Sequence, residues 1–544
     1  MIDRSKTVMW GLPLLSAVLM SIPWLVPHCG AVALVALVPL LIAEDHATAT
    51  GARRFSLASY TAFVLWNALT TFWVCNATVG GGLASIFVMA AVPTLIFALF
   101  RIGRRHLFGV TPYLLLASAW IAWERWCLVD AQIMWPWLVL GNAFADSTGL
   151  VQWYEYTGTL GGSLWIWAAN LGIFGILKAV SDGRWASGWN HVARAAAALG
   201  ITLVIAGPLA VSAIIYSNYE EKSEGTLDVC IGQPNFDPYH KFESMTQAEQ
   251  TDVLLDLFEQ GLRSRTDTMA PVMLLAPETF TSDIMLPEQE SSPTLQTFRQ
   301  FMRRHPGTEM LFGASAYEMH PTRSAPSKCA REWGGGWLVS RNSAVLADSS
   351  SRFEIYHKSR LVVGTELTPY PDVFIPLESL VCRIIGQRPP LMGRCEGQEE
   401  TSLLHFGGTV PVGCAVCYES IFGEHCTSYV KKGAAAMTVI TNDAWWGDTP
   451  GYRQHFNYSR LRAIELRRDF ARCGNTGVSA FIDQKGDVVS RGPWWKPCVM
   501  NGVVNLNHDE TFFVRHGDMV GRVCTFVFLL LAVLLLVLLP GKRS

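Results

Sequence analysis

The chain has 544 residues, of which half are hydrophobic and only 16% are charged. A soluble domain carries about 25% charged residues, and here the deficit is concentrated in positions 1–220, which hold only 20 charged residues. These positions therefore predict a membrane region, and most of the remainder predicts a globular domain. The net charge of −2 and the lack of a long basic run argue against a nucleic-acid partner. Abundant apolar residues exclude a collagen-like or disordered chain.

Eight apolar stretches approach the length of about 20 residues that spans a bilayer. They lie near 8–25, 29–43, 56–76, 82–100, 110–128, 160–177, 195–217 and 523–540. We therefore divide the chain into a membrane domain over 1–220 with about seven helices, a globular domain over 221–518, and a final helix with a short basic tail over 519–544. A cleaved signal peptide is the alternative for the first stretch, but further apolar spans follow and favour an uncleaved helix.

The positions of lysine and arginine near the spans predict the orientation, because cytoplasmic loops carry an excess of both. With eight spans, twelve basic residues fall on one side, and Arg125 at a helix end is the exception. The twelve are Arg4, Lys6, Arg53, Arg54, Arg101, Arg104, Arg105, Lys178, Arg184, Arg194, Lys542 and Arg543. Both termini are thus expected in the cytoplasm, with residues 221–518 on the opposite side.

From about residue 227 the sequence alternates between short apolar runs and helix-like stretches. The runs predict strands over 272–276, 310–316, 410–416 and 435–441, and the intervening patterns predict helices over 246–263, 292–304 and 456–469. This alternation favours an α/β sandwich with a buried sheet. Reacting residues in such folds gather just past the carboxyl ends of strands.

Three polar residues at predicted strand ends form a chemical set: Glu278, Lys358 and Cys417. A cysteine nucleophile needs a base that removes its proton and a cation that stabilises the charge developing on an attacked carbonyl oxygen. Glutamate, lysine and cysteine can supply these three roles. Since any domain of this size has many such residues, the set alone does not identify a function.

The sequences around these residues resemble the nitrilase superfamily, whose triad is Glu, Lys and Cys, and most of all its membrane branch, the apolipoprotein N-acyltransferase family. The matching segments are LLAPETF, YHKSRLVVGTE, VPVGCAVCYESIFG, ITNDAWWGDTPGYRQHF, RLRAIELRRDFARCGNTGVSAFID and FFVRHGD, with WERW, WPWLVLGN and YTGTLGGSLW upstream. The resemblance covers almost the whole chain and implies an αββα nitrilase-like domain outside the cytoplasm, joined to a multi-span helical domain.

The resemblance also implies roles for individual residues. Glu278 would be the general base, Lys358 the oxyanion-stabilising cation and Cys417 the nucleophile. The supporting residues that match are Glu366, Asn342, Tyr418 and Glu419, with Trp445 beside the substrate. The chain departs from the family after GQPNF, because well-known members have a tryptophan there and the nearest aromatic residues here are Tyr239 and Phe242.

The implied activity is transfer of an acyl chain from the sn-1 position of a phospholipid to the amine of a diacylglyceryl-cysteine apolipoprotein, through a thioester. The implied location is the bacterial inner membrane, with the catalytic domain in the periplasm. No metal or other cofactor is expected, because neither a P-loop nor a correctly placed dinucleotide-binding motif is present. The alternatives are a membrane-anchored amidase that uses water as the acceptor and, from a different class, a transporter or receptor with a ligand-binding ectodomain.

Several local features have a structural and a functional interpretation. Cys414 and Cys417 form C-x-x-C, which we interpret as one core cysteine and one nucleophile because no second metal-binding pair accompanies it. The stretch 367–381 is expected to be a loop that enters lipid, and Glu124 is expected to point into the helix bundle. Trp445 and Trp446 suit either an acyl pocket or core packing. Nine of the thirteen cysteines lie in the globular domain, and Cys329, Cys382 and Cys395 are the strongest candidates for disulfides.

Overall fold

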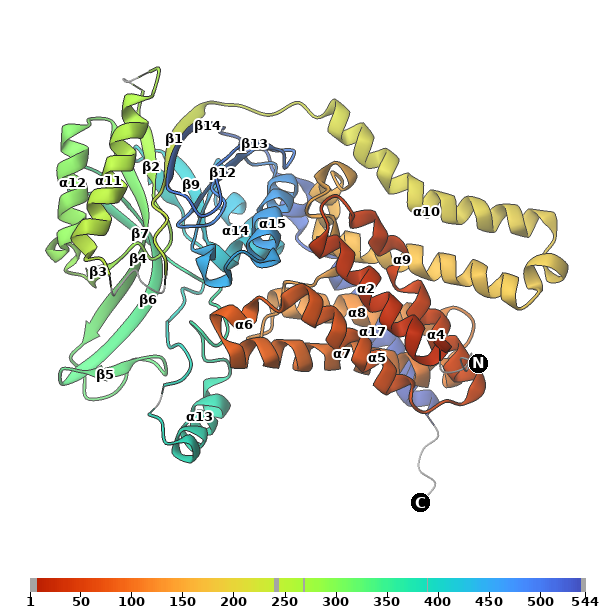
Figure 1. The fold of residues 1–544 in the computed structure, drawn as a ribbon. Coiled ribbons are helices and arrows are strands. Elements are labelled where there is room, and N and C mark those ends of the chain that lie inside the picture. The colour runs from red at the N-terminus through yellow and green to blue at the C-terminus, as the bar shows by residue number, and fades with distance from the viewer. Residues whose placement is uncertain (1–6, 239–243, 268–269, 389, 540–544) are drawn as a thin grey trace.

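The computed structural model describes residues 7–238, 244–267, 270–388 and 390–539. Figure 1 shows a helical region beside an α/β region, with α14 and α15 between the strands and the helical region. The helical elements before the first strand, together with the last helix, are η1 (Thr7–Gly11), α2 (Leu12–Leu25), η2 (Gly30–Val32), α3 (Ala33–Ala36), α4 (Val38–Thr50), α5 (Phe55–Thr71), α6 (Val74–Ala77), α7 (Val79–His106), α8 (Thr111–Val129), η3 (Leu140–Phe144), η4 (Thr148–Leu150), α9 (Tyr154–Ser181), η5 (Arg184–Gly188), α10 (His191–Asn218) and α17 (Met519–Leu538).

Six helical segments among the described residues are long and apolar enough to cross a membrane. They are Thr7–Leu25, Gly30–Thr50, Val79–His106, Tyr154–Ser181, His191–Asn218 and Met519–Leu538. The other two predicted spans, 56–76 and 110–128, coincide with the helices α5 and α8. The C-terminal helix α17 packs on α8, where Leu531 and Leu535 bury themselves against Leu115. The C-terminal helix thus belongs to the same helical bundle as the N-terminal helices.

The α/β region contains two sheets. The first has the order β14-β1-β2-β4-β6-β5, with β3 also paired to β4 and β7 to β6, and the second has the order β13-β12-β11-β10-β9-β8. The strands are β1 (Thr226–Gln233), β2 (Val272–Leu275), β3 (Thr281–Leu286), β4 (Thr308–His320), β5 (Arg331–Trp333), β6 (Gly336–Ala347), β7 (Phe353–His357), β8 (Leu404–Phe406), β9 (Val410–Val416), β10 (Ala436–Thr441), β11 (Phe470–Gly474), β12 (Ala480–Ile482), β13 (Val488–Arg491) and β14 (Cys498–Asn505). The four predicted strands correspond to β2, β4, β9 and β10.

Helices cover the outer face of each sheet. The helical elements of this region are α11 (Gln247–Arg263), η6 (Gln289–Ser291), α12 (Pro293–Arg304), α13 (Pro371–Ile385), η7 (Cys417–Ile421), α14 (Gly423–Lys431), η8 (Asp443–Trp446), α15 (Pro450–Leu466) and α16 (Phe512–His516). Side chains of both sheets share one buried core, in which Ile231 and Leu311 from the first meet Val416 and Val439 from the second. The predicted αββα sandwich joined to a helical membrane domain is therefore confirmed.

The two regions share a second buried core. Leu461 and Ile464 of α15 and Ile421 of η7 belong to the same apolar cluster as Trp66 and Trp120 of the membrane helices. Burying apolar surface stabilises this contact in proportion to the area removed from water. The outer helical layer of the sandwich is thus also the layer that packs on the membrane domain.

Two expectations need correction. The stretch 367–381 is not simply a loop, because residues 371–385 form the helix α13, in which apolar residues recur at helical spacing and leave Val373, Leu377, Leu380 and Ile384 exposed. The prolines in the stretch had hidden that period. All thirteen cysteines lie among the described residues and all are free. Cys329, Cys382 and Cys395 are thus unbridged, since a polar local sequence does not ensure the distance of about 4 Å between Cβ atoms that a disulfide requires.

Glu124 points into the helix bundle, as expected, and has a structural role there. Its side chain is buried on α8, and Oε1 accepts hydrogen bonds from the indole of Trp120 and from the backbone N–H of Leu140. Arg125 instead pairs with Asp130. The carboxylate therefore anchors the loop between α8 and η3, and this loop contacts the catalytic domain.

Candidate active site

The strands place the three predicted catalytic residues at the membrane-facing edge of the sandwich. Glu278 follows β2, Lys358 follows β7 and Cys417 follows β9. The backbone of Glu278 lies so close to β4 that a Cβ on Gly313 would come within 2.5 Å of the Glu278 Cα. Only glycine fits at such an approach, and its N–H donates to the Pro277 carbonyl. The turn that positions Glu278 therefore packs directly on the backbone of β4 at Gly313, where no side chain intervenes.

A buried charge cluster surrounds Lys358. Its Nζ lies 3.1 Å from Oε1 of Glu278 and 3.0 Å from Oε1 of Glu366. Asn342 of β6 donates through Nδ2 to the same two carboxylates, at 2.8 Å and 2.7 Å. The lysine side chain is only 1% exposed. The structure thus brings together four of the predicted residues, with one ammonium between two carboxylates.

This environment determines the protonation states of Lys358 and Cys417. Burial alone would lower the pKa of Lys358, but the charges of Glu278 and Glu366 raise that pKa well above its ordinary value. Burial raises the pKa of the Cys417 thiol, the Glu278 charge raises it further, and Lys358 opposes both. The lysine is therefore charged and the resting cysteine is a neutral thiol. A thiol in that state needs a base at the moment of attack.

Cys417 occupies a strained turn between β9 and η7. Its φ of +53° lies in the left-handed region, which costs a residue other than glycine about 1–3 kcal/mol and is common at functional sites. Its side chain is largely buried. Cys414, three residues earlier on β9, belongs to the same buried cluster between the sheets as Cys417. Both cysteines are free, but only the Cys417 thiol feels the charges of Lys358 and Asp443.

Glu419 connects the nucleophile turn to the lysine loop rather than to the thiol. Its carboxylate is fully buried and accepts the backbone N–H groups of Val416, Ser359 and Arg360 and the hydroxyl of Tyr356. Burial would raise its pKa, but these donors and His425 lower it below the usual value. A carboxylate so fully bonded is a poor proton acceptor. Glu419 therefore fixes Cys417 relative to Lys358.

Aromatic side chains from the membrane domain lie next to this turn. The ring of Trp137 lies within 5.9 Å of the rings of Trp73, Tyr418 and Trp446, and the Tyr418 hydroxyl donates to the Met134 carbonyl. Trp445 is 40% exposed beside this cluster, whereas Trp446 is packed into it. Tyr239 and Phe242 lie outside the described residues. Of the tryptophan pair, Trp445 is therefore the more exposed.

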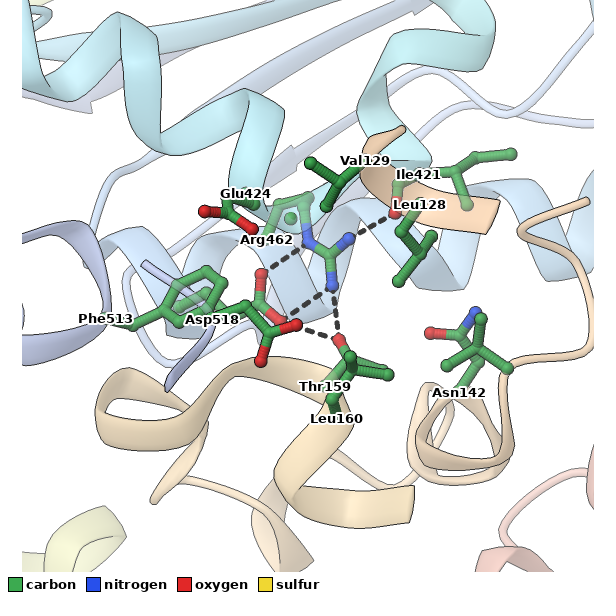
Figure 2. Close-up of a pocket in the computed structure, with 13 residues that line it drawn as sticks. Leu128, Val129, Asn142, Thr159, Leu160, Ile421, Glu424, Arg462, Phe513 and Asp518 are labelled. Carbon is green, nitrogen blue, oxygen red and sulfur yellow. Dashed lines mark hydrogen bonds and ion pairs between the residues drawn. The ribbon is translucent and has the colours of Figure 1, made fainter. Parts of the chain in front are cut away.

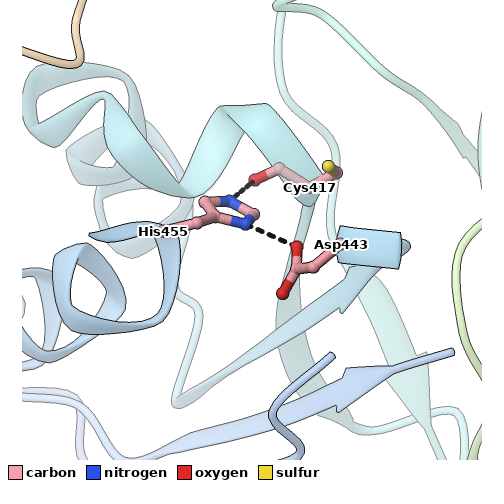
Figure 3. Close-up of side chains that lie close together, drawn as sticks. All are labelled: Cys417, Asp443 and His455. Carbon is pink, nitrogen blue, oxygen red and sulfur yellow. Dashed lines mark hydrogen bonds and ion pairs between the residues drawn. The ribbon is translucent and has the colours of Figure 1, made fainter. Parts of the chain in front are cut away.

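Asp443, His455 and Arg472 lie in segments that resemble the family, but the sequence predicted no role for them. In Figure 3 the two nitrogens of His455 face Asp443 and the carbonyl of Cys417. The distances are 2.8 Å to Asp443 Oδ1 and 3.0 Å to the Cys417 oxygen. Arg472 pairs with Asp443 at 2.8 Å, and burial together with this guanidinium lowers the pKa of His455. The sequence signal that could have revealed this group is an aspartate and a histidine twelve residues apart, Asp443 before the start of α15 and His455 in its first turns.

Cys417, Asp443 and His455 form the one group of three residues of metal-ligand types found among the described parts of the chain. A ligand atom from each of Cys417, Asp443 and His455 lies within 4.8 Å of the others. However, Asp443 is already paired with Arg472 and bonded by Thr441, and both imidazole nitrogens have partners. A divalent ion would have to displace these bonds and lie beside a guanidinium. The donor set therefore does not fit a resident metal.

A pocket at the junction of the two regions is lined by residues of both and not by Cys417 (Figure 2). Arg462 lies at its centre and contacts Glu465, Thr159 and the Ile421 carbonyl. These bonds link α15 to α9 and to η7. The pocket is thus part of the contact between the domains rather than of the charge cluster.

Two packed sheets covered by helices, with Glu, Lys and Cys together at strand ends, define a catalytic domain of the carbon–nitrogen hydrolase class, here joined to membrane helices. Residues 273–508 match the carbon–nitrogen hydrolase family and residues 16–172 match the apolipoprotein N-acyltransferase N-terminal domain. The chain is 30% identical over 527 residues to the apolipoprotein N-acyltransferase of Chlorobaculum tepidum, covering 94% of each. The chain belongs to the apolipoprotein N-acyltransferase family and is an acyltransferase.

Two further similar proteins are a curated relative and a solved structure. The apolipoprotein N-acyltransferase of Geobacter metallireducens is 26% identical over 526 residues, covering 94% of this chain and 92% of that protein. Among solved structures, Nit3 of Saccharomyces cerevisiae, a member of branch 10 of the nitrilase superfamily, matches with a TM-score of 0.38 and 14% identity over 56% of this chain and 99% of that one. The resemblance predicted from the sequence is confirmed.

Proposed function

We propose that this enzyme transfers an acyl chain from the sn-1 position of a phospholipid to the α-amino group of a diacylglyceryl-cysteine apolipoprotein. The names of the relatives support the acceptor, and the buried Glu278–Lys358–Cys417 cluster beside membrane helices supports a lipid donor. In our proposal Glu278, Lys358 and Cys417 act on the substrate directly. Glu366, Asn342, Tyr418 and Glu419 support them, and Trp445 contacts the acyl chain.

In the first half-reaction, Glu278 accepts the thiol proton while the Cys417 sulfur attacks the ester carbonyl carbon. The negative charge that develops on the carbonyl oxygen is stabilised by the Lys358 ammonium and by the backbone N–H of Tyr418. When the tetrahedral intermediate collapses, the carbon–oxygen ester bond breaks and the Glu278 proton passes to the leaving alkoxide. A thioester and a lysophospholipid result.

In the second half-reaction, the lipoprotein amine attacks the thioester carbonyl. Glu278 accepts a proton from the attacking nitrogen, and the oxyanion is stabilised as before. Collapse of the intermediate breaks the carbon–sulfur bond, and the proton returns to the Cys417 sulfur. The enzyme is regenerated with its thiol, and the lipoprotein carries an amide-linked chain. The Lys358 ammonium stabilises the oxyanion in both half-reactions, and the net charge of the cluster is the same before and after the full reaction.

In this proposal the orientation of the enzyme in the membrane brings its lipid substrate to the active site. The catalytic domain lies in the periplasm and both termini lie in the cytoplasm of a bacterial inner membrane, which is supported by the twelve basic residues on one side. The exposed apolar face of α13, near the loop where the Tyr370 N–H donates to Gln132 of the membrane domain, enters the outer leaflet. Such a face would be an aggregation hazard on a soluble enzyme.

The observation that carries the proposal is the buried Lys358 ammonium between Glu278 and Glu366, beside a neutral Cys417 thiol and a wall of membrane-domain tryptophans. A membrane-anchored amidase would use the same cluster with water as the acceptor. The amidase and the acyltransferase are distinguished by the second half-reaction, because only the acyltransferase passes the chain to an amine.

The experiment is intact-mass analysis of the purified protein after incubation with phospholipid vesicles. We expect one acyl adduct on Cys417 that disappears when a diacylglyceryl-cysteine peptide is added, with the chain recovered on its amine. Loss of the adduct to water at the same rate with and without the peptide would favour the amidase. The absence of any adduct under conditions of turnover would reject the thioester.

A further inference from the structure

Two side chains, those of His455 and Ser420, lie within hydrogen-bond distance of the backbone carbonyl of Cys417. His455 Nε2 lies 3.0 Å from this oxygen, and the Ser420 hydroxyl donates to it at 2.8 Å. His455 lies on α15 and its side chain is completely buried. The imidazole therefore contacts the backbone of the nucleophile, not its sulfur (Figure 3).

The other side of the imidazole is held by a buried ion pair. One amine of Arg472, Nη2, lies 2.8 Å from Asp443 Oδ2 and 3.0 Å from His455 Nδ1. Since that amine has two hydrogens, it can donate to both. Asp443 Oδ1 also accepts the hydroxyl of Thr441 at 2.7 Å. Nδ1 also lies 2.8 Å from Asp443 Oδ1, so Asp443 and Arg472 both hold this side of the ring while Nε2 faces the Cys417 carbonyl.

The turn needs such support because Cys417 has its φ at +53°. A strained backbone of this kind persists only when its surroundings over-determine it. If the carbonyl were released, the residue could relax toward an extended conformation, and its sulfur would move away from the cluster of Glu278 and Lys358. A displacement of about 1 Å at a reacting atom can cost on the order of 10²-fold in rate.

We propose that His455, oriented by Asp443 and Arg472, is a positioning residue that holds the Cys417 carbonyl through an Nε2–H hydrogen bond and so aims the nucleophile at the substrate. The inference rests on the proposed function, in which the Cys417 sulfur attacks the ester. His455 itself exchanges no proton with the substrate. Its contribution is to keep the strained turn in the one conformation that lets Glu278 reach the thiol.

Two amide substitutions of His455 distinguish the contact of the imidazole with the Cys417 carbonyl from its contact with Asp443. In His455→Gln the amide nitrogen can occupy the place of Nε2 and donate to the Cys417 carbonyl. In His455→Asn the shorter amide reaches only the place of Nδ1 and keeps only the contact with Asp443. Both variants bury an uncharged amide, so a purely structural role would affect them similarly.

The measurements are single-turnover acylation by phosphatidylethanolamine–phosphatidylglycerol vesicles, the KM for these lipids, and the melting temperature. We expect His455→Gln to acylate within about fivefold of the parent and His455→Asn to be slower on the order of 10²-fold, with KM unchanged in both. Equal rates in the two variants, or a faster His455→Asn, would overturn the proposal.

A second variant covers the case in which His455→Asn does not fold. Ser420→Ala removes the other donor to the same carbonyl, together with its 3.1 Å contact to His455 Nε2, with little change in volume. We expect acylation to slow roughly fivefold at an unchanged melting temperature. A parent rate in Ser420→Ala would contradict the proposal. If the parent protein itself forms no adduct, the proposed function fails, and alkylation of Cys417 by iodoacetamide in the same variants still tests the positioning of the sulfur.

Discussion

Two of the regions in which this enzyme buries charges use them differently. At the junction between the domains, three buried arginines are each matched by one carboxylate. The pairs are Arg460 with Asp146, Arg462 with Glu465, and Arg467 with Glu155. Their remaining N–H groups donate to carbonyls and amide oxygens of both domains, such as Gln152 and the Gly486 carbonyl. Each junction pair is thus neutral and has no charge left over.

The catalytic cluster has one carboxylate in excess. Lys358 alone faces Glu278 and Glu366, and the adjacent Cys417 thiol is neutral. The surplus negative charge can take up a proton without leaving the lysine unpaired. Burial and ion pairing alone therefore do not distinguish the two regions. The imbalance between acids and bases next to the Cys417 thiol does, and it is the feature on which our proposed mechanism depends.

The largest effect we predict comes from removing the nucleophile. Cys417→Ala should abolish both the acyl adduct and turnover, because in our proposal the Cys417 sulfur carries the acyl chain. Cys414→Ala is the matched control, since Cys414 is on the same strand but buried in the core. It should retain activity. The measurement is intact mass after exposure to phospholipid, and an inactive but folded Cys414→Ala would restore the interpretation of C-x-x-C as a redox pair.

The next largest effect tests the surplus carboxylate. Glu278→Gln keeps the shape of the side chain but cannot accept a proton, so single-turnover acylation should slow by about 10²–10⁴-fold, the usual worth of a general base. Glu419→Gln is the contrasting variant. It places an amide among four donors and should lower the melting temperature instead. A folded Glu278→Gln enzyme with the parent acylation rate would show that the base lies elsewhere.

A smaller effect tests whether Glu366 acts through Lys358. Lys358→Ala should slow both half-reactions by about 10²–10³-fold, as does the loss of one oxyanion donor. Glu366→Gln should slow them less. Because the two residues are in contact, the double variant should cost less than the sum of the single changes in activation free energy. The measurement is acylation followed by a chase with the peptide amine. Strict additivity would mean that Glu366 works independently of the lysine.

That Glu278, Lys358 and Cys417 gather at one place could be predicted from the sequence because each residue follows a short apolar run, and their catalytic roles stay a prediction. Glu278, Lys358 and Cys417 are marked by strand ends, and local motifs assigned Glu366 and Asn342 to the same site. Those signals are local in the chain. The same is true of the apolar spans, whose composition alone requires a membrane or a buried helix.

The rest depends on contacts between distant segments, which local patterns do not encode. Nothing in the run around His455 indicates that its ring meets the carbonyl of Cys417, 38 positions earlier. The pairing of Arg467 with Glu155 joins residues 312 positions apart. The helix α13 was missed for a different reason, because Pro371 and Pro376 interrupt its apolar period although the first occupies the helix start, where proline is tolerated.

The pH dependence of thiol alkylation tests the resting state of the cluster. Because the pKa of Cys417 is raised by burial and by Glu278, the thiolate should form only above the usual range for cysteine. Alkylation by iodoacetamide should therefore rise up to roughly tenfold per pH unit through pH 9, without a plateau at lower pH. A plateau below pH 8 would mean that a thiolate–lysine ion pair exists at rest and that no base is needed.

The smallest effect on catalysis is expected at the junction. Arg467→Met should leave the acylation rate of the folded enzyme within about threefold of the parent, because the arginine contacts Glu155 and Gln152 and not the charge cluster. Its removal strands a carboxylate that is only 13% exposed, and breaking a buried pair costs about 3–5 kcal/mol. The melting temperature should therefore fall, and Glu155→Gln in the same chain should restore part of it. Arg263→Met is the matched control, since that arginine is 77% exposed beside Glu259 and surface pairs contribute about 0–1 kcal/mol. A junction variant that keeps its stability but loses acylation would mean that the position of the catalytic domain on the membrane helices itself determines the rate.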